Sequence, residues 1–216
     1  MDNKRGMFVV FEGIDGSGKG TQLNKLIEHI ESLDKYQDVV KTHEPWKSKE
    51  IKSRLKEDEE AYSDGIKMAG LYIKDRLNHS EEIDNLLGRG YFVLCDRYKL
   101  STCAYQWTQG VNLYKLLKMH EDERILSPTL NIFISTSAEI AKDRMQKRGD
   151  AREKFENFEF QRDLIAHYNN LINRNDAKEL FGEVVEINGR GTKEEVAEKV
   201  KKSFNIFYNK WKENNN

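Results

Sequence analysis

The segment from Gly13 to Thr21, which reads Gly-Ile-Asp-Gly-Ser-Gly-Lys-Gly-Thr, limits the possible folds of this chain more than any other stretch. An apolar run at residues 7–11 precedes it and predicts a short buried strand, and an apolar stripe with helical spacing follows it. The stripe consists of Leu23, Leu26, Ile27, Ile30 and Leu33. This order of strand, glycine-rich loop, lysine and helix predicts a phosphate-binding loop, because the glycines let backbone N–H groups turn toward a phosphate at a helix N-terminus.

The residues of this loop are the expected ligands of a nucleotide triphosphate. They are Gly13, Ile14, Asp15, Gly16, Ser17, Gly18, Lys19, Gly20 and Thr21. Lys19 adds a full positive charge for the β- and γ-phosphates. The position after Lys19 is Gly20 rather than a serine or threonine, and the hydroxyl comes one residue later at Thr21. The alternative interpretation, a turn that only caps a helix, is disfavoured because the strand and the helix are both in place.

Composition limits the class of protein. The 216 residues contain no linker rich in proline, glycine or serine, so we expect a single domain that spans residues 1–216. Lysine and arginine number 36 against 37 aspartates and glutamates, which gives no overall basic signal for nucleic acid. No apolar run approaches the ~18 residues of a membrane-spanning helix, and no leader segment is evident. Cys95 and Cys103 lack metal-ligand spacing and are typical of a reduced protein, so we expect a cytoplasmic location.

Strand and helix patterns alternate along the chain. After the first strand, apolar runs predict strands near residues 39–40, 91–95, 130–134 and 184–187. Helical patterns are expected near 48–60, 66–87, from about 99 to 120, 138–147, 160–173 and from 192 onward, the helix at 48–60 being solvated. Strands that alternate with helices predict βαβ crossovers. We therefore expect an α/β fold in which a five-stranded parallel sheet lies between two helical layers.

Charged residues stand where such a sheet binds ligands. Asp96 and Arg97 follow a buried strand directly, at the carboxyl end where open α/β sheets take up ligands, although they could also form a structural ion pair. Tyr72 and Arg76 are four residues apart and share one helix face, and the alternative for Tyr72 is a place in the apolar core stripe of that helix.

Four local patterns, in this order and spacing, resemble the thymidylate kinase family. They are Phe-Glu-Gly-Ile-Asp-Gly-Ser-Gly-Lys at 11–19, Thr-His-Glu-Pro at 42–45, Asp-Arg-Leu-Asn-His at 75–79, and Asp-Arg-Tyr-Lys-Leu-Ser-Thr-Cys-Ala-Tyr-Gln at 96–106. The first pattern is shared by many nucleotide hydrolases, and the Gly-Lys-Gly-Thr-Gln sequence that overlaps its end is similar to that of adenylate-kinase-like nucleotide kinases. The fourth is much more specific. The resemblance covers essentially the whole chain and implies a P-loop nucleotide kinase with a short lid.

The resemblance also implies an acceptor site for dTMP. Its expected residues are Asp15, Pro45, Lys47, Tyr72, Arg76, Arg97, Thr102 and Tyr105. Asp15 is expected to bind the 3′-hydroxyl, and Arg97 is expected to grip the acceptor phosphate through two parallel hydrogen bonds. The resemblance also implies that Asp96 acts near Mg²⁺, and because Gly20 offers no side-chain ligand, water and phosphates are expected to complete the metal site. Tyr72 is expected to stack on thymine, and Arg76 is expected to bond the base or the phosphate.

Other acceptor residues depart from the family pattern. Thr102 and Tyr105 match positions that meet the base and exclude a 2′-hydroxyl, but members often carry asparagine or glutamine near Thr102. Lys47 stands in for an arginine of some members, and Trp46 replaces a small residue.

A basic segment is the expected lid, at about residues 147–158. Gly16 occupies the loop position where one branch of the family carries an arginine, and members without that arginine take their transition-state arginines from the lid. We therefore expect Arg148 and Arg152 to act on the transferring phosphoryl group, together with Lys19, Asp15 and Arg97 as catalytic residues. Arg144 is expected to stack on adenine, and Gly149 is placed as a hinge. A solvated helix face is the alternative for this segment.

The resemblance implies ATP-dependent phosphorylation of dTMP to dTDP with Mg²⁺, a step in dTTP synthesis. One alternative is another deoxynucleoside monophosphate or nucleoside kinase of the same fold, because a single methyl group contributes only about 0.8 kcal/mol of burial. A second is a regulatory P-loop module without an acceptor. The family resemblance further implies a homodimer, with nucleotides as the only other partners.

Overall fold

The computed structural model describes residues 5–57, 64–149 and 158–214. Its centre is a five-stranded sheet in the order β2-β3-β1-β4-β5, and every neighbouring pair is parallel. The strands are β1 (Phe8–Glu12), β2 (Val39–His43), β3 (Phe92–Asp96), β4 (Leu130–Ser135) and β5 (Glu183–Asn188). β1 lies in the middle, so the loop that follows it emerges at the centre of the carboxyl edge of the sheet.

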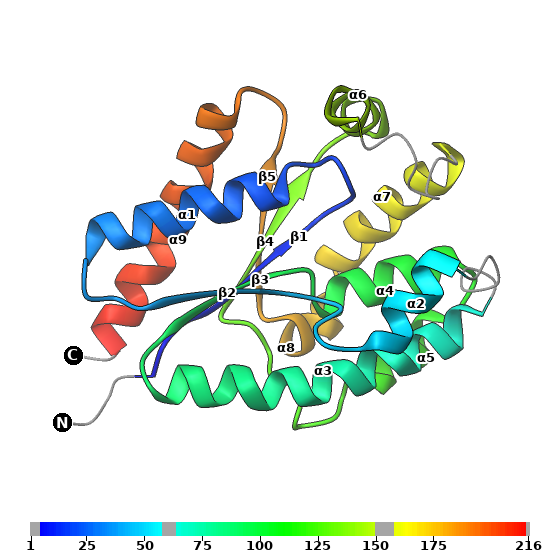
Figure 1. Cartoon of the computed structure of the whole chain (residues 1–216), viewed down its shortest axis with the longest axis horizontal. Coiled ribbons are helices and arrows are strands. Elements are labelled where there is room, and N and C mark those ends of the chain that lie inside the picture. The colour runs from blue at the N-terminus through cyan, green and yellow to red at the C-terminus, as the bar shows by residue number, and fades with distance from the viewer. Residues whose placement is uncertain (1–4, 58–63, 150–157, 215–216) are drawn as a thin grey trace.

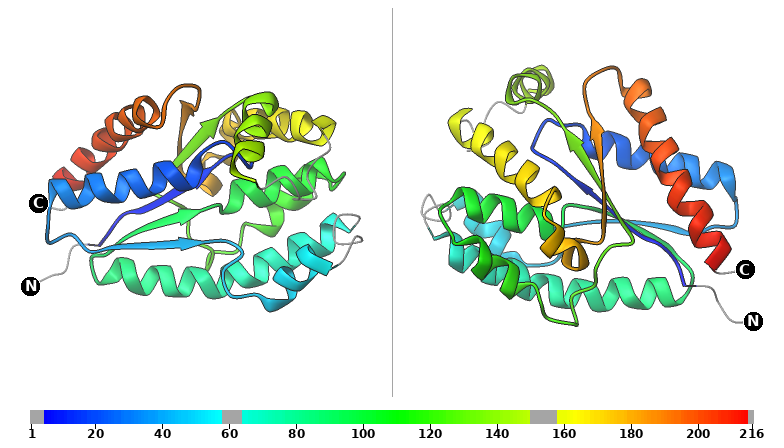
Figure 2. Two further views of the ribbon diagram at one scale, coloured as in Figure 1. Left: turned by 45° about the horizontal axis from the view of Figure 1, so that its top comes forward. Right: turned by 180° about the vertical axis from the view of Figure 1, so that it is seen from behind.

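Helices cover both faces of the sheet, as the alternation of patterns predicts. They are α1 (Lys19–Leu33), α2 (Lys49–Glu57), α3 (Gly65–Gly88), α4 (Lys99–Thr108), α5 (Leu113–Met119), α6 (Ala138–Arg148), α7 (Phe158–Ile172), α8 (Lys178–Phe181) and α9 (Lys193–Asn214), with a 3₁₀ turn, η2 (Asn175–Ala177). Figure 1 shows α1 and α9 on one side of the sheet and α3, α4 and α7 on the other. Figure 2 shows α6 beside α7. The predicted three-layer α/β/α architecture is confirmed.

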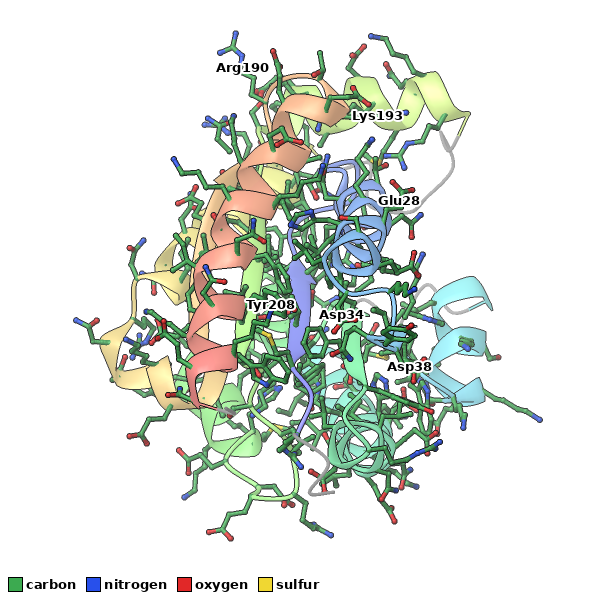
Figure 3. All side chains as sticks on the ribbon, turned by 90° about the vertical axis from the view of Figure 1, so that its left-hand side faces the viewer. Glu28, Asp34, Asp38, Arg190, Lys193 and Tyr208 are labelled. Atoms are coloured by element: carbon green, nitrogen blue, oxygen red, sulfur yellow. The ribbon has the colours of Figure 1, made fainter. Side chains whose placement is uncertain are left out.

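Two apolar layers fix the strands between the helices. Leu23, Leu26 and Ile30 of the predicted α1 stripe are buried against the sheet, together with Val196, Val200 and Phe204 of α9. Tyr208 continues this face of α9 toward the strands, as Figure 3 shows. On the opposite face, α3 packs against Phe8, Val10, Val93 and Cys95, while α4 and α7 form a third cluster. Burial of apolar surface contributes roughly 25 cal/mol per Å² to the free energy of folding. The packed layers therefore hold the strands and their carboxyl ends in fixed positions.

The structure corrects two details of the sequence prediction. The helical region expected from 99 to about 120 is two helices, α4 and α5, because Gly110 takes a left-handed conformation (φ 87°) between them. The segment expected as a solvated helix at 48–60 is α2, whose Ile51 is fully buried against Met68 of α3, and residues 58–60 lie outside the described part of the chain. In the described ranges no helix is long and apolar enough to cross a membrane.

Candidate active site

The loop after β1 has the geometry expected of a phosphate-binding loop. It runs from Gly13 to Gly18, and α1 begins at Lys19 behind it. Gly16 has a left-handed φ of 78°, and a side-chain carbon built there would collide with the main-chain carbonyl of Ala141 in α6. Only glycine fits this close approach. An arginine at this position is therefore sterically excluded, in agreement with the absence of a P-loop arginine from the sequence.

Lys19 is buried inside this loop. Its side chain is 7% exposed, and its Nζ donates to Ile14 O at 3.0 Å and lies 3.9 Å from Asp15 Oδ1. Burial lowers the pKa of Lys19, the charge of Arg97 lowers it further, and Asp15 opposes both, so that the pKa stands at about 8. Burial therefore outweighs the nearby charge of Asp15, and an anionic ligand at this loop would favour the charged form of Lys19.

This pKa predicts a proton linkage on nucleotide binding. A bound triphosphate favours the charged form of Lys19, so the pKa rises on binding and the complex takes up about half a proton at pH 8. Calorimetry of ATP binding in two buffers of different ionisation enthalpy measures this uptake. In Lys19→Arg the uptake at pH 8 is expected to vanish, because a guanidinium stays protonated there. Equal uptake in the two proteins would contradict the assignment.

Arg97 is the centre of the site at the end of β3. Its backbone has a φ of 69°, and its N–H donates to Phe11 O, which joins β3 to β1. Its Nη2 forms an ion pair with Asp15 and donates to the Tyr105 hydroxyl, and Tyr105 in turn lies 3.2 Å from Asp15 Oδ2. Burial raises the pKa of Asp15, but the charges of Arg97 and Lys19 outweigh it and bring that pKa to about 2. Three predicted residues, Asp15, Arg97 and Tyr105, thus meet at one point.

Glu12 supports this arrangement and was missed by the sequence analysis. It is fully buried at the end of β1 and accepts hydrogen bonds from the backbone N–H groups of Tyr98 and Ser101, and also from the Ser101 hydroxyl. Burial raises the pKa of Glu12, although its Ser101 bonds act in the opposite direction. Glu12 therefore holds the start of α4, including Ser101, whose hydroxyl accepts a hydrogen bond from Arg97 Nη1 at 3.3 Å. A charged residue at the end of an otherwise apolar strand is the signal that could have identified it.

Two buried oxygen atoms beside the P-loop fit a cation. In the described residues, Asp96 Oδ1 and Ser17 Oγ are buried and have no hydrogen-bond partner. Oxygen atoms of this kind are the ligands that Mg²⁺ prefers, usually with one or two carboxylates and with phosphates and water supplying the rest. No group of three or more histidine, cysteine or acidic side chains in the described ranges could hold a metal without such help. The donor set therefore fits a metal ion that arrives with a nucleotide.

Arg76 and Glu44 form a buried pair on the other side of the site. Arg76 comes from α3 and is 1% exposed, and its Nε donates to Glu44 Oε2 at 2.9 Å. Its Nη2 donates both to Glu44 and to the Thr102 hydroxyl, the latter at 2.8 Å. Arg76 and Thr102, which were predicted from separate motifs, are thus in contact. Tyr72, one turn earlier in α3, is half-buried against the Ile51 cluster.

A second group of contacts shapes the loop after Pro45. The backbone N–H groups of Trp46, Lys47 and Ser48 all donate to the Asp75 carboxylate of α3. The Trp46 ring stacks on His79 with centroids 5.0 Å apart, and Lys47 Nζ lies 3.7 Å above the Trp46 ring. The motif 75–79 thus has two functions. Asp75 and His79 hold this loop, and Arg76 faces Glu44 and Thr102.

Arg144 connects the P-loop with the end of β5. Its Nη1 donates to Ser17 O at 3.0 Å, and its Nη2 donates to Gly189 O at 2.8 Å. Arg190, in the loop between β5 and α9, lies beside the start of α9 (Figure 3). Arg148 lies at the last turn of α6, and Gly149 ends that helix in a left-handed cap. Of the predicted lid, residues 150–157 with Arg152 lie outside the described part of the chain.

Comparison with known proteins identifies the family. The sequence profile described as thymidylate kinase matches residues 11–204. The chain is 36% identical over 205 residues to a thymidylate kinase of Caldicellulosiruptor saccharolyticus, covering 92% of this chain and 95% of the relative. It is 34% identical over 200 residues to a probable thymidylate kinase of Pyrococcus horikoshii, covering 89% and 92%, and 32% identical over 161 residues to a thymidylate kinase of Plasmodium falciparum, covering 72% and 73%. The P-loop, the residues around Arg97 and these matches agree: the chain belongs to the thymidylate kinase family.

Proposed function

We propose that this chain transfers the γ-phosphoryl group of ATP to dTMP, giving dTDP for dTTP synthesis, and that residues 1–216 act as a single nucleoside monophosphate kinase domain. Membership of the thymidylate kinase family supports the reaction and implies a nucleotide as phosphate donor. The observation that carries the proposal is the pairing of a P-loop lysine with an Asp15–Arg97–Tyr105 cluster beside it. A hydrolase or a switch does not need this second group of polar ligands.

On the donor side, the loop residues 13–21 bind the triphosphate, and Lys19 neutralises its β- and γ-phosphates. Arg144 lies between the P-loop and the loop after β5, which suits an adenine ring. Asp96 and Ser17 hold Mg²⁺ together with phosphates and water. The ion supplies charge neutralisation for the transferring group.

On the acceptor side, Asp15 binds the 3′-hydroxyl and Arg97 binds the phosphate of dTMP. Both residues are already oriented by Tyr105 and by each other. Phosphoryl transfer needs no covalent intermediate, so positioning and charge carry the catalysis. Tyr105 closes the 2′ side of the sugar against a ribonucleotide.

The base and the loop beyond it complete the acceptor site. Tyr72 stacks on thymine, and Arg76 and Thr102 meet its polar edge. Pro45 and Lys47 approach the acceptor phosphate from the loop that Asp75 holds. The cation of Lys47, which lies above the Trp46 ring, is available to a phosphate.

Arg148 and Arg152 act from the lid on the charge of the transition state. The carbonyl of Ala141 leaves no room for an arginine at position 16, which supports a source outside the P-loop. An arginine in this role contributes about 10³–10⁵ to the rate in related phosphoryl-transfer systems. Closure of the lid excludes water from the reaction.

Two further properties follow the family resemblance and are proposed with it. We expect a homodimer, which sedimentation would distinguish from a monomer. We also expect a cytoplasmic protein, because Cys95 and Cys103 are free and buried, as suits a reducing compartment.

A steady-state panel of nucleoside monophosphates with ATP tests the acceptor. We expect the highest kcat/KM on dTMP. We expect dUMP to be lower by at least about fourfold, since the 5-methyl group contributes about 0.8 kcal/mol. UMP should be poorer still because Tyr105 crowds the 2′-hydroxyl. A higher kcat/KM on dUMP, dCMP or a nucleoside would contradict the proposed substrate.

A further inference from the structure

His120 is a buried group that neither the motifs nor the proposed reaction uses. It is the C-terminal cap of α5 and is 1% exposed. Its Nδ1 lies 2.7 Å from Leu116 O, and its Nε2 lies 2.7 Å from Arg76 Nη1. A carbonyl only accepts hydrogen bonds and a guanidinium only donates them. The two partners therefore require a proton on Nδ1 and a free lone pair on Nε2.

The surroundings keep this ring neutral. Burial lowers the pKa of His120 well below its ordinary value, and the charge of Arg76 lowers it further, against the opposing bond to Leu116. Cys103 Sγ lies 3.7 Å from Nδ1, and Lys99 contributes another nearby cation. A protonated ring would place an N–H against an N–H of Arg76. His120 is consequently an acceptor for Arg76 throughout the neutral pH range.

A count of donors shows what this acceptor does to Arg76. A guanidinium has five N–H groups. Glu44 takes the one on Nε and one on Nη2, and Thr102 takes the other on Nη2. His120 takes one on Nη1. Among the described residues, a single N–H on Nη1 has no hydrogen-bond partner.

We propose that His120 is a positioning residue that fixes the Arg76 guanidinium so that only one N–H remains for the acceptor nucleotide. This inference rests on the proposed function and makes it more specific. A single donor suits one carbonyl oxygen of a base, whereas a phosphate is gripped by two parallel N–H groups. Arg76 thus contacts the base rather than the phosphate. A thymine carbonyl accepts this N–H, whereas the amino group of cytosine, itself a donor, is repelled.

A pair of substitutions separates this role from simple packing. In His120→Gln, Oε1 reaches about as far as Nε2 and can still accept from Arg76. In His120→Asn, the shorter amide can still donate to Leu116 O but does not reach Arg76 Nη1. His29→Asn is the matched control, because His29 bonds Asn205 between α1 and α9 and does not contact Arg76.

We expect His120→Asn to raise the KM for dTMP about tenfold and to reduce the preference for dTMP over dCMP about tenfold, the size of one lost hydrogen bond. Its kcat and its KM for ATP should stay within about twofold of wild type. His120→Gln should remain within about threefold on every parameter, and His29→Asn should be unchanged. Wild-type KM and base preference in His120→Asn would overturn the inference, as would an equal loss in both His120 variants.

A spectroscopic measurement on the unaltered protein guards against misfolded variants. Long-range proton–nitrogen correlation at pH 7 should show His120 as the neutral Nδ1–H tautomer. An imidazolium or an Nε2–H tautomer would overturn the inference. Failure of the proposed function looks different, because the wild-type protein would then not phosphorylate dTMP at all.

Discussion

Lys19→Ala is expected to lower kcat by at least about 10³-fold while the protein keeps its fold. Removal of one preorganised electrostatic ligand of a transition state costs about 10²–10³ in rate, and Lys19 carries a full charge in a nearly water-free loop. Because burial already opposes its charged form, the unliganded protein loses little stability when this ammonium is removed. The substitution is thus expected to abolish catalysis without unfolding the protein.

A coupled assay for ADP and a thermal melt together check this result. Lys25→Ala is the matched control, since Lys25 lies in the same helix and pairs with Glu194 at the surface, away from the P-loop. We expect the control to keep its activity and to melt close to wild type, because solvent screens an ion pair at the surface. Near-normal turnover in Lys19→Ala would rule out the phosphate-binding role of the loop.

Glu44→Gln is expected to lower the free energy of unfolding by about 3–5 kcal/mol. The substitution keeps the size of the side chain but removes the negative charge, so the Arg76 cation stays buried without its partner. Both side chains are almost fully inaccessible, at 1% and 3% exposure. His79 Nδ1, 3.1 Å from Glu44 Oε1, loses its acidic neighbour as well.

Urea unfolding measures this loss, and a double variant shows its cause. When Arg76 is also replaced in Glu44→Gln/Arg76→Met, no uncompensated charge remains, so much of the stability should return. The pair of Arg174 with the exposed Asp176 is a control, because Asp176→Asn should leave the midpoint of the urea transition close to that of wild type. A loss below about 1 kcal/mol in Glu44→Gln would show that Glu44 and Arg76 do not form a buried ion pair.

The parts of the fold that could be predicted are those with a local signal. The apolar run of β3 and the glycine-rich loop before α1 each occupy a few consecutive residues, and the structure confirms both elements. The break between α4 and α5 was missed because one glycine in a helical pattern does not by itself end a helix. The buried face of α2 depends on Met68, which lies in another helix.

The polar side chains of the site were harder to predict for the same reason. Glu12 and Ser101 are 89 residues apart, and Arg76 and His120 are 44 apart, so no short pattern joins either pair. The family motifs include Glu12 and Glu44 but do not indicate which residues bond to each carboxylate. His120 lies outside every motif, and only the packing of α5 against α3 and α4 places it beside Arg76.

The most direct test of the central claim is to follow both products of the reaction at once. With ATP, Mg²⁺ and dTMP, chromatography of the mixture should show dTDP and ADP appearing in equal amounts, and ADP formation without dTMP should be slower by orders of magnitude. This outcome is expected if the Asp15–Arg97–Tyr105 cluster holds an acceptor beside Lys19. ADP formation at the same rate with and without dTMP, and no dTDP, would contradict the assignment of a dTMP kinase.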